Sequence, residues 1–339
     1  MLLRHDQNNF DGVRLAAALA VLASHQCLLS GLAEPRPIGP MTLGSIAVLV
    51  FFAISGYLVA SSWTADPTPW RFAARRFLRI WPAYAVVVLA ASAWIMATDD
   101  RPLATTAAWM FIVKHLTFHS FEWVFFPQQH DPRLDPPLWT IPFEIGCYAA
   151  FAFVAVALRK WWPPLLAAAF VVTQAAWGWR LTAFDPSDAS LATDAVLFGA
   201  FFSAGALLQG FPALRDLRST AVLVAAGVAA FLAGSQVLGL TLAIPALAVA
   251  VGMRAWPGLA HAGRFGDFSY GVYLWGWPIQ QIVATRLGRR AGFWPLAGLA
   301  FLAVAVVAAL SWHLVEKRAL RAKPSSRTPW PRWLTLERG

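Results

Sequence analysis

The stretch LAAALAVLASHQCLLSG, residues 15–31, is almost entirely apolar and indicates the fold class. A helix that spans the hydrocarbon core of a membrane needs about 20 such residues. Similar Ala-, Leu- and Val-rich runs recur along the 339 residues, which are 58% hydrophobic and only 13% charged. A soluble domain carries roughly 25% charged residues. The composition therefore predicts an all-α, polytopic membrane protein.

The lengths of the apolar runs predict about ten transmembrane helices. The expected spans are 12–31, 43–62, 80–97, 138–158, 161–180, 191–209, 219–236, 238–253, 268–286 and 293–314. In this interpretation residues 1–320 form a single integral-membrane domain, and residues 321–339 form a basic cytoplasmic tail.

Arg and Lys in the short loops predict the orientation, because cytoplasmic loops carry an excess of these residues. Basic clusters at 71–79, 159–160 and 215–218 all face the cytoplasm if the N-terminus does, as does the tail. The cluster at 286–290 conflicts with this scheme. Contact with anionic headgroups accounts for the net charge of +10 without nucleic acid as a partner.

The segment 105–137 mixes apolar and charged residues and does not fit a simple span. Irregular backbone at membrane depth is tolerated only where protein buries it or where it lines a cavity. We therefore expect a re-entrant or outer-side segment that forms a wall or lid of an active site.

His25 lies inside the first apolar run. An ionisable side chain in a span is costly and suggests a functional site, although a histidine hydrogen-bonded in a bundle core is the alternative. Asp11 and Arg14 stand three residues apart at the start of this helix, where they can pair or form an interfacial cap. His115 and His119 have the spacing of metal ligands, but no third ligand is evident, and no metal is expected.

Two further positions combine charge with apolar surroundings. Arg76 and Arg79 share a helix face and offer a forked site for phosphate oxygens, unless they serve topology alone. Glu144 lies in an apolar stretch at a depth similar to that of His25, which suggests an acid/base pair or a structural ion pair. The Ser55-Gly56 pair permits close helix contact or a close approach of the backbone to a ligand.

Read in order, these segments resemble the acyltransferase 3 family of ten-span membrane enzymes that acylate surface sugars. The matching motifs are Asp-Gly-x-Arg with a distant His (11–25), Phe-Phe-x-Ile-Ser-Gly-Tyr (51–57), Arg-x-x-Arg with Ile-x-Pro-x-Tyr (76–84), Trp-x-x-x-x-Glu (139–144), Ser-Tyr-Gly-x-Tyr-Leu (269–274) and Ser-Trp-x-x-x-Glu-Lys (311–317). Thr140 and Ile141 replace the family's Ser-Leu, Gly276 stands where many members carry a histidine, and Arg318 stands where a proline is common.

The resemblance implies O-acyl transfer from cytoplasmic acyl-CoA, usually acetyl-CoA, to a hydroxyl of a polysaccharide or lipid-linked glycan, in the bacterial inner membrane. His25 would take the hydroxyl proton or carry the acyl group, and Glu144 would orient its imidazole. No permanently bound cofactor is implied. The expected donor-binding residues are Arg76, Arg79, Tyr84, Ser55 and Gly56, and the expected supporting residues are Asp11, Arg14, Trp139 and Tyr270.

Two other classes of function remain open from the sequence. A transporter or flippase of a glycan or acyl group would also place ionisable residues at depth, although many transporters have internal repeats and none is visible here. A structural or interaction protein would leave the intramembrane His25 and Glu144 unexplained.

Overall fold

The computed structural model describes residues 9–98, 106–118, 135–180, 191–254, 262–287 and 291–325. Within these ranges the regular elements are helices, and the β-type pairing is one isolated antiparallel bridge between Ile38 and Met41. The predicted all-α class is therefore confirmed.

The helices lie close to the predicted spans. They are α1 (Phe10–Leu29), α2 (Leu43–Ala65), α3 (Pro69–Thr98), α4 (Thr106–Leu116), α5 (Ile141–Leu158), α6 (Trp162–Arg180), α7 (Leu191–Gly210), α8 (Leu217–Leu232), α9 (Gln236–Gly252), α10 (Ser269–Leu287), α11 (Phe293–Ser311) and α12 (Lys317–Arg321). Short 3-10 turns cover Pro136–Thr140, Arg159–Trp161, Pro212–Arg215 and Ala262–Phe265, and a π-helical turn, Trp312–Glu316, joins α11 to α12.

A count of ten membrane crossings is not confirmed. In the described parts of the chain, five helical stretches are long and apolar enough to cross a membrane: Phe10–Leu29, Leu43–Ala65, Pro69–Trp94, Pro136–Ala175 and Phe293–Arg321. The helices α8 and α9 are apolar but shorter. In α10 the buried side chains of Gln280 and Gln281 lower the hydropathy, and Gln280 donates to the Leu22 carbonyl of α1 at 2.8 Å.

The helix α3 begins eleven residues before the expected span, at Pro69. Its first turns therefore carry the basic cluster at 71–79 on helical backbone rather than in a loop. This fixes the spacing of the arginines, so that Arg76 and Arg79 lie on neighbouring positions of one helix surface.

Close contacts between small residues hold α2 against α7. A Cβ added at Gly56 would lie 1.9 Å from the carbonyl oxygen of Phe202, and one added at Gly205 would lie 1.9 Å from that of Ala53. Two glycines thus let the backbones of the two helices touch, as small residues do at helix interfaces in membranes. Other helix pairs in contact are α1 with α2 and α10, α8 with α9, and α10 with α11.

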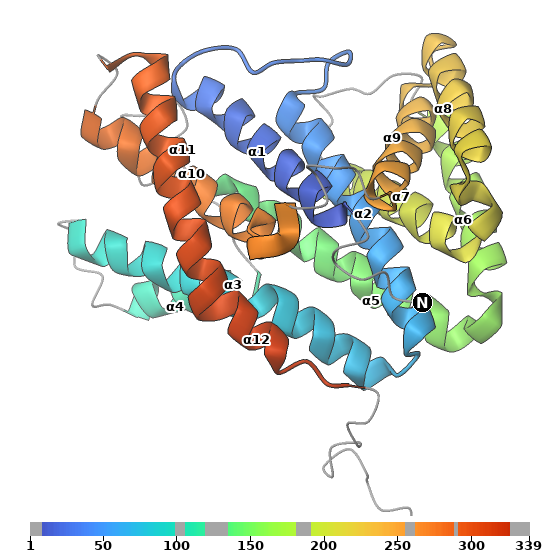
Figure 1. Cartoon of the computed structure of the whole chain (residues 1–339), viewed down its shortest axis with the longest axis horizontal. Helices are drawn as coiled ribbons and strands as arrows, with labels where there is room; N and C mark the ends of the chain where they lie inside the picture. Colours follow the sequence, from blue (N-terminus) through green and yellow to red (C-terminus); the bar gives the residue numbers. More distant parts are fainter. Residues whose placement is uncertain are drawn as a thin grey trace, which may run out of the picture.

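Both ends of the described chain contact other helices of the bundle (Figure 1). At the start, the Asn9 amide donates to the Gly252 carbonyl at the end of α9, at 2.7 Å. At the other end, α11 continues through the π-helical turn into α12, which packs against α3.

The segment 105–137 is only partly described. It contains α4, whose 11 residues are too short to span a membrane, and the start of the turn Pro136–Thr140, whose prolines are buried. Residues 119–134 lie outside the described ranges, so the re-entrant interpretation stays a prediction.

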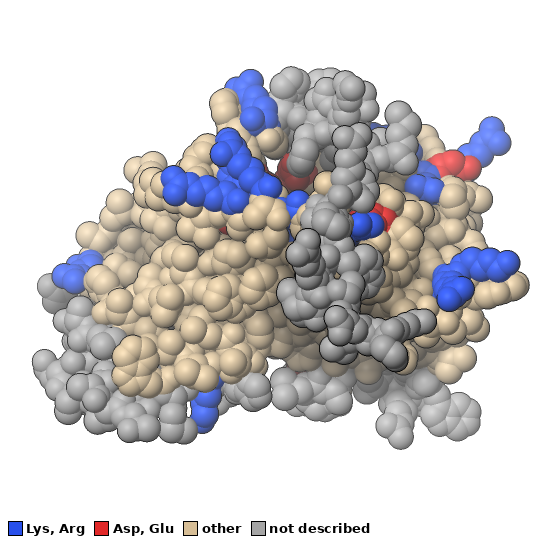
Figure 2. Space-filling model, turned by 90° about the horizontal axis from the view of Figure 1, so that it is seen from below, with Lys and Arg blue, Asp and Glu red and all other residues tan. Residues whose placement is uncertain are grey.

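Charged side chains are sparse on much of the surface. In the view of Figure 2, separate groups of Lys and Arg stand around a body made mostly of other residues, with few Asp or Glu. Exposed large apolar side chains such as Phe153, Trp294 and Leu302 lie on α5 and α11. An outward-facing apolar surface of this kind suits contact with lipid.

Candidate active site

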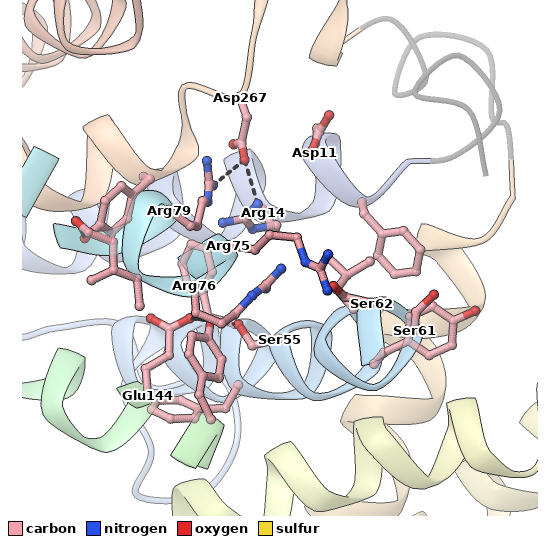
Figure 3. Close-up of a pocket in the computed structure, with 18 of the residues that line it drawn as sticks. Asp11, Arg14, Ser55, Ser61, Ser62, Arg75, Arg76, Arg79, Glu144 and Asp267 are labelled. Carbon is pink, nitrogen blue, oxygen red and sulfur yellow. Dashed lines mark hydrogen bonds and ion pairs between the residues drawn. The ribbon is translucent and has the colours of Figure 1, made fainter. Parts of the chain in front are cut away.

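A cavity of about 770 Å³ lies among the start of α1, the second half of α2, the first turns of α3, α5 and the segment after α12. Its wall carries both signs of charge. The lining side chains include Asp11, Arg14, Ser55, Arg75, Arg76, Arg79, Glu144, Tyr148, Arg215, Asp267, Tyr270 and Lys323. Figure 3 shows the arginines of α3 pointing into the space bordered by Asp267, by the serines of α2 and by Glu144. We call this space the cationic cavity.

Asp267 neutralises two of its arginines. Its Oδ2 accepts from Arg14 Nη1 at 2.6 Å and from Arg79 Nη2 at 2.5 Å (Figure 3). Burial disfavours the charged carboxylate, but the guanidiniums of Arg14 and Arg79 outweigh it and hold the pKa of Asp267 below its usual range. The loop before α10 is thereby tied to α1 and α3. The sequence left a pair with Asp11 or an interfacial cap open for Arg14, and the structure pairs Arg14 with Asp267.

Asp66, in the turn between α2 and α3, neutralises another pair of arginines. It accepts from Arg71 Nη2 at 2.8 Å and from Arg75 Nη1 at 2.6 Å. The hydrogen bonds from Arg71, joined by those from Arg75, hold the pKa of Asp66 well below its usual range. These contacts fix the α2–α3 turn beside the cationic cavity, whose wall includes Ala65 and Arg75.

Arg76 is left without such a carboxylate. Among the described residues it forms no ion pair, and its Nε is buried with no hydrogen-bond partner. Its guanidinium lies over the rings of Phe72 and Tyr148, 5.9 and 5.7 Å from their centres. Aromatic faces hold the guanidinium by cation–π attraction and leave its edge N–H groups for an anion.

Lys323 adds a cation that sequence reasoning had assigned to the cytoplasmic tail. It follows α12 and lines the cationic cavity beside Leu320. Burial, followed by repulsion from Arg76, Arg79, Arg14 and Arg75, lowers the pKa of Lys323 to about 7. An amine close to four guanidiniums makes a concentrated positive region, and such a region suits an anionic ligand.

Glu144 lies on the same cavity, on α5. Its Oε1 accepts from Ser55 Oγ at 3.0 Å and from the Tyr148 hydroxyl. The carboxylate thus joins α2 to α5 and stands near Arg76, to whose charge it is electrostatically coupled.

His25 lines a second, smaller cavity of about 280 Å³, which we call the histidine cavity. Its imidazole meets the edge of Trp277 on α10, with ring centres 4.8 Å apart. Glu34 and Trp139 also line this cavity. Since Glu144 lines the cationic cavity and His25 the histidine cavity, the structure separates the two residues expected to act as a pair.

Three more predicted site residues have defined places. Tyr270 lines the cationic cavity and donates to the Ile80 carbonyl at 2.9 Å. Tyr84 is fully buried outside both cavities, and its hydroxyl donates to the His115 carbonyl at 2.7 Å. Gly56 lies at the α2–α7 crossing, so its surroundings support the packing alternative rather than a contact with donor.

Gly276, the position at which the family resemblance leads us to expect a histidine, faces α1. A Cβ placed there would lie 2.9 Å from Leu22 Cδ1. Leu22 therefore occupies the space that a larger side chain would need, and this position contributes no acid or base.

Comparison with known proteins gives the family of the chain. The profile of the acyltransferase 3 family, an acyltransferase domain, matches residues 7–313, and the chain belongs to this family. It is an O-acyltransferase. Among its relatives are the O-acetyl transferase of Shigella phage Sf6 (28% identity over 94% of this chain and 98% of the relative) and the acyltransferase MdmB of Streptomyces mycarofaciens (27%, 94% and 94%). The exopolysaccharide production protein ExoZ of Rhizobium meliloti is 28% identical over 83% of this chain and 90% of its own length. No solved structure matches.

Proposed function

We propose that this enzyme moves an acyl group, in the first instance acetyl, from acyl-CoA in the cationic cavity to a glycan hydroxyl in the histidine cavity. The observation that carries the proposal is the order of the two cavities along one helix. On α1, Arg14 lines the cationic cavity and His25 lines the histidine cavity. These positions are eleven residues apart, or about 16 Å along a helix.

The phosphates of CoA suit the cationic cavity. Arg76 offers N–H groups that no carboxylate of the described residues occupies, and Lys323 and Arg215 line the same space. Charge-assisted hydrogen bonds to phosphate are stronger than neutral ones. Arg79 supports this site indirectly, because its bond to Asp267 positions the start of α3.

The acyl transfer needs one base. The acceptor oxygen attacks the thioester carbonyl carbon, the C–S bond breaks, and the thiolate leaves on CoA. His25 takes the hydroxyl proton and can return it to the thiolate. Here Glu144 shapes the donor side through Ser55 and Tyr148.

The orientation follows from the donor. Acyl-CoA is made in the cytoplasm, so the cationic cavity opens to that side, with both termini cytoplasmic and the enzyme in the inner membrane. The relatives named for O-acetyl transfer and for exopolysaccharide production support a glycan acceptor.

The test uses membranes from the cells that carry this protein and from a deletion strain. With acetyl-labelled CoA, the deletion strain should lack label in its surface glycan fraction, and the restored gene should return it. Equal labelling in both strains would contradict the proposal. Labelled acetyl trapped on His25 as a readily hydrolysed acyl-imidazole would identify the histidine as the acyl carrier instead of the base.

A further inference from the structure

Residues of α1, α2 and α10 line both cavities, and along each helix the residues of one cavity lead to those of the other. On α1, Arg14 precedes His25, and on α10, Tyr270 precedes Trp277, as the chain runs from the cationic to the histidine cavity. The helix α2 runs the opposite way, from Ser45 at the histidine cavity to Ser55 at the cationic one. The two spaces are therefore stacked along the helix axes, with a boundary between them.

The boundary is made of a few named side chains. Val48, Thr140 and Tyr273 line both cavities. The hydroxyls of Thr140 and Tyr273 are 2.6 Å apart, and the Tyr273 hydroxyl donates to the Pro137 carbonyl at 2.8 Å. The Thr140 hydroxyl also lies within hydrogen-bond distance of the Pro137 carbonyl, at 3.2 Å, so either hydroxyl can be the donor between Thr140 and Tyr273. The hydroxyl pair thus joins the turn Pro136–Thr140 to α10 across the boundary.

The two cavities suit different parts of the reaction. Pockets that enclose drug-sized ligands measure about 300–1,000 Å³. The cationic cavity, at about 770 Å³, lies well inside this range, and the histidine cavity, at about 280 Å³, lies just below it. The smaller space fits an acyl group and part of a sugar rather than a whole donor.

We propose that Thr140 and Tyr273 form the constriction through which the acyl group reaches His25, and that this pair limits the length of the acyl chain. The inference rests on the proposed function. Thr140 is buried, with 6% of its surface exposed, and its neighbour across the boundary, Tyr273, is held by hydrogen bonds to Thr140 and to the Pro137 carbonyl. A longer acyl chain must displace this pair, while acetyl is short enough to reach past it.

The experiment measures acyl length in the same membranes, with labelled acetyl-CoA and butanoyl-CoA and the native glycan as acceptor. The wild type should incorporate butanoyl at no more than about one-tenth of the acetyl rate, because one extra methylene alone changes discrimination by about tenfold or more. Thr140→Ala removes the hydroxyl and a methyl group and should raise the butanoyl-to-acetyl ratio about tenfold. Tyr273→Phe keeps the ring, is the gentler variant for folding, and should raise the same ratio.

Thr241→Ala is the matched control. Thr241 is buried, donates its hydroxyl to the Val237 carbonyl at 2.8 Å, and lines neither cavity. Its replacement should leave the ratio unchanged.

The outcomes separate the two proposals. If the wild type incorporates no acetyl into glycan, the proposed function fails. If it incorporates acetyl but transfers butanoyl equally well, or if both boundary variants keep the wild-type ratio, only the constriction is overturned. A parallel fall of both rates in Thr140→Ala and Thr241→Ala, at constant ratio, would show a purely structural role and would overturn it as well.

Discussion

His25 and Glu144 line different cavities, although both lie in apolar segments of the bundle. Glu144 accepts hydrogen bonds from Ser55 and Tyr148, and the imidazole of His25 packs on Trp277. The histidine therefore stands at the acceptor end of the proposed path, and the carboxylate at the donor end. Donor binding and transfer should accordingly respond to different substitutions.

Arg76→Gln should weaken CoA binding by about tenfold to a hundredfold, because a hydrogen bond to a charged group contributes about 1.5–3 kcal/mol. The affinity of the purified protein for CoA, measured by calorimetry, checks this. Arg218→Gln, at an exposed position on α8 outside the cavity, should leave the affinity unchanged. If the Arg76 variant bound CoA as tightly as the wild type, this arginine would serve membrane topology and not donor binding.

Asp267→Asn should destabilise the fold by about 3 kcal/mol, because it leaves the mostly buried guanidiniums of Arg14 and Arg79 without their carboxylate. A lower thermal midpoint in detergent is the expected observation. Asp216→Asn is a suitable comparison, since Asp216 caps α8 through the Ser219 amide and Asn caps equally well. A midpoint unchanged in the Asp267 variant would contradict the bridging role.

The lowered pKa of Lys323 predicts that donor binding depends on pH. Its pKa of about 7 means that the amine is charged below pH 7 and neutral above it. CoA affinity should therefore fall from about pH 6 to about pH 8, beyond any change from the phosphates of CoA. Lys323→Gln should bind more weakly at pH 6 and lose most of this slope, whereas Arg321→Gln, exposed on the same segment, should behave as the wild type. Identical pH profiles for all three proteins would exclude Lys323 from the site.

Gly56→Ala should lower the thermal midpoint, because the added methyl group meets the backbone of α7 at 1.9 Å. Overpacking of this kind costs about 1–3 kcal/mol. Gly205→Ala should behave alike, since its methyl group meets α2 in the same way. Gly146→Ala, with no atom within 4 Å of the new group, should not destabilise the protein. A Gly56 variant that kept its stability but lost CoA affinity would restore the donor-binding role.

Local sequence signals predicted much of the fold and part of the site. Apolar runs predicted the helices, because burial in lipid requires them, and charge within apolar runs marked His25, Arg76 and Glu144. The family motifs added Ser55 and Tyr270 to the same cavity wall. The number of membrane crossings could not be fixed in this way, since polar core residues such as Gln280 lower the hydropathy of a helix buried in the bundle.

The partners of these residues could not be predicted, because they are set by packing between distant segments. Asp267 meets Arg79 across 188 positions and Arg14 across 253. A charged residue just before the Ser-Tyr-Gly motif was the available signal for Asp267. The composition of the tail gave no such signal for Lys323, because the position of this residue depends on the packing of α12 against α3.

The separation of donor binding from transfer is tested most directly in His25→Ala, with CoA affinity and glycan acetylation measured on the same membrane preparation. The prediction is wild-type affinity for CoA and no acetyl transfer, because the histidine lies in the smaller cavity, beyond Thr140 and Tyr273. Acetyl transfer at the wild-type rate, or a loss of CoA binding equal to that of Arg76→Gln, would contradict it.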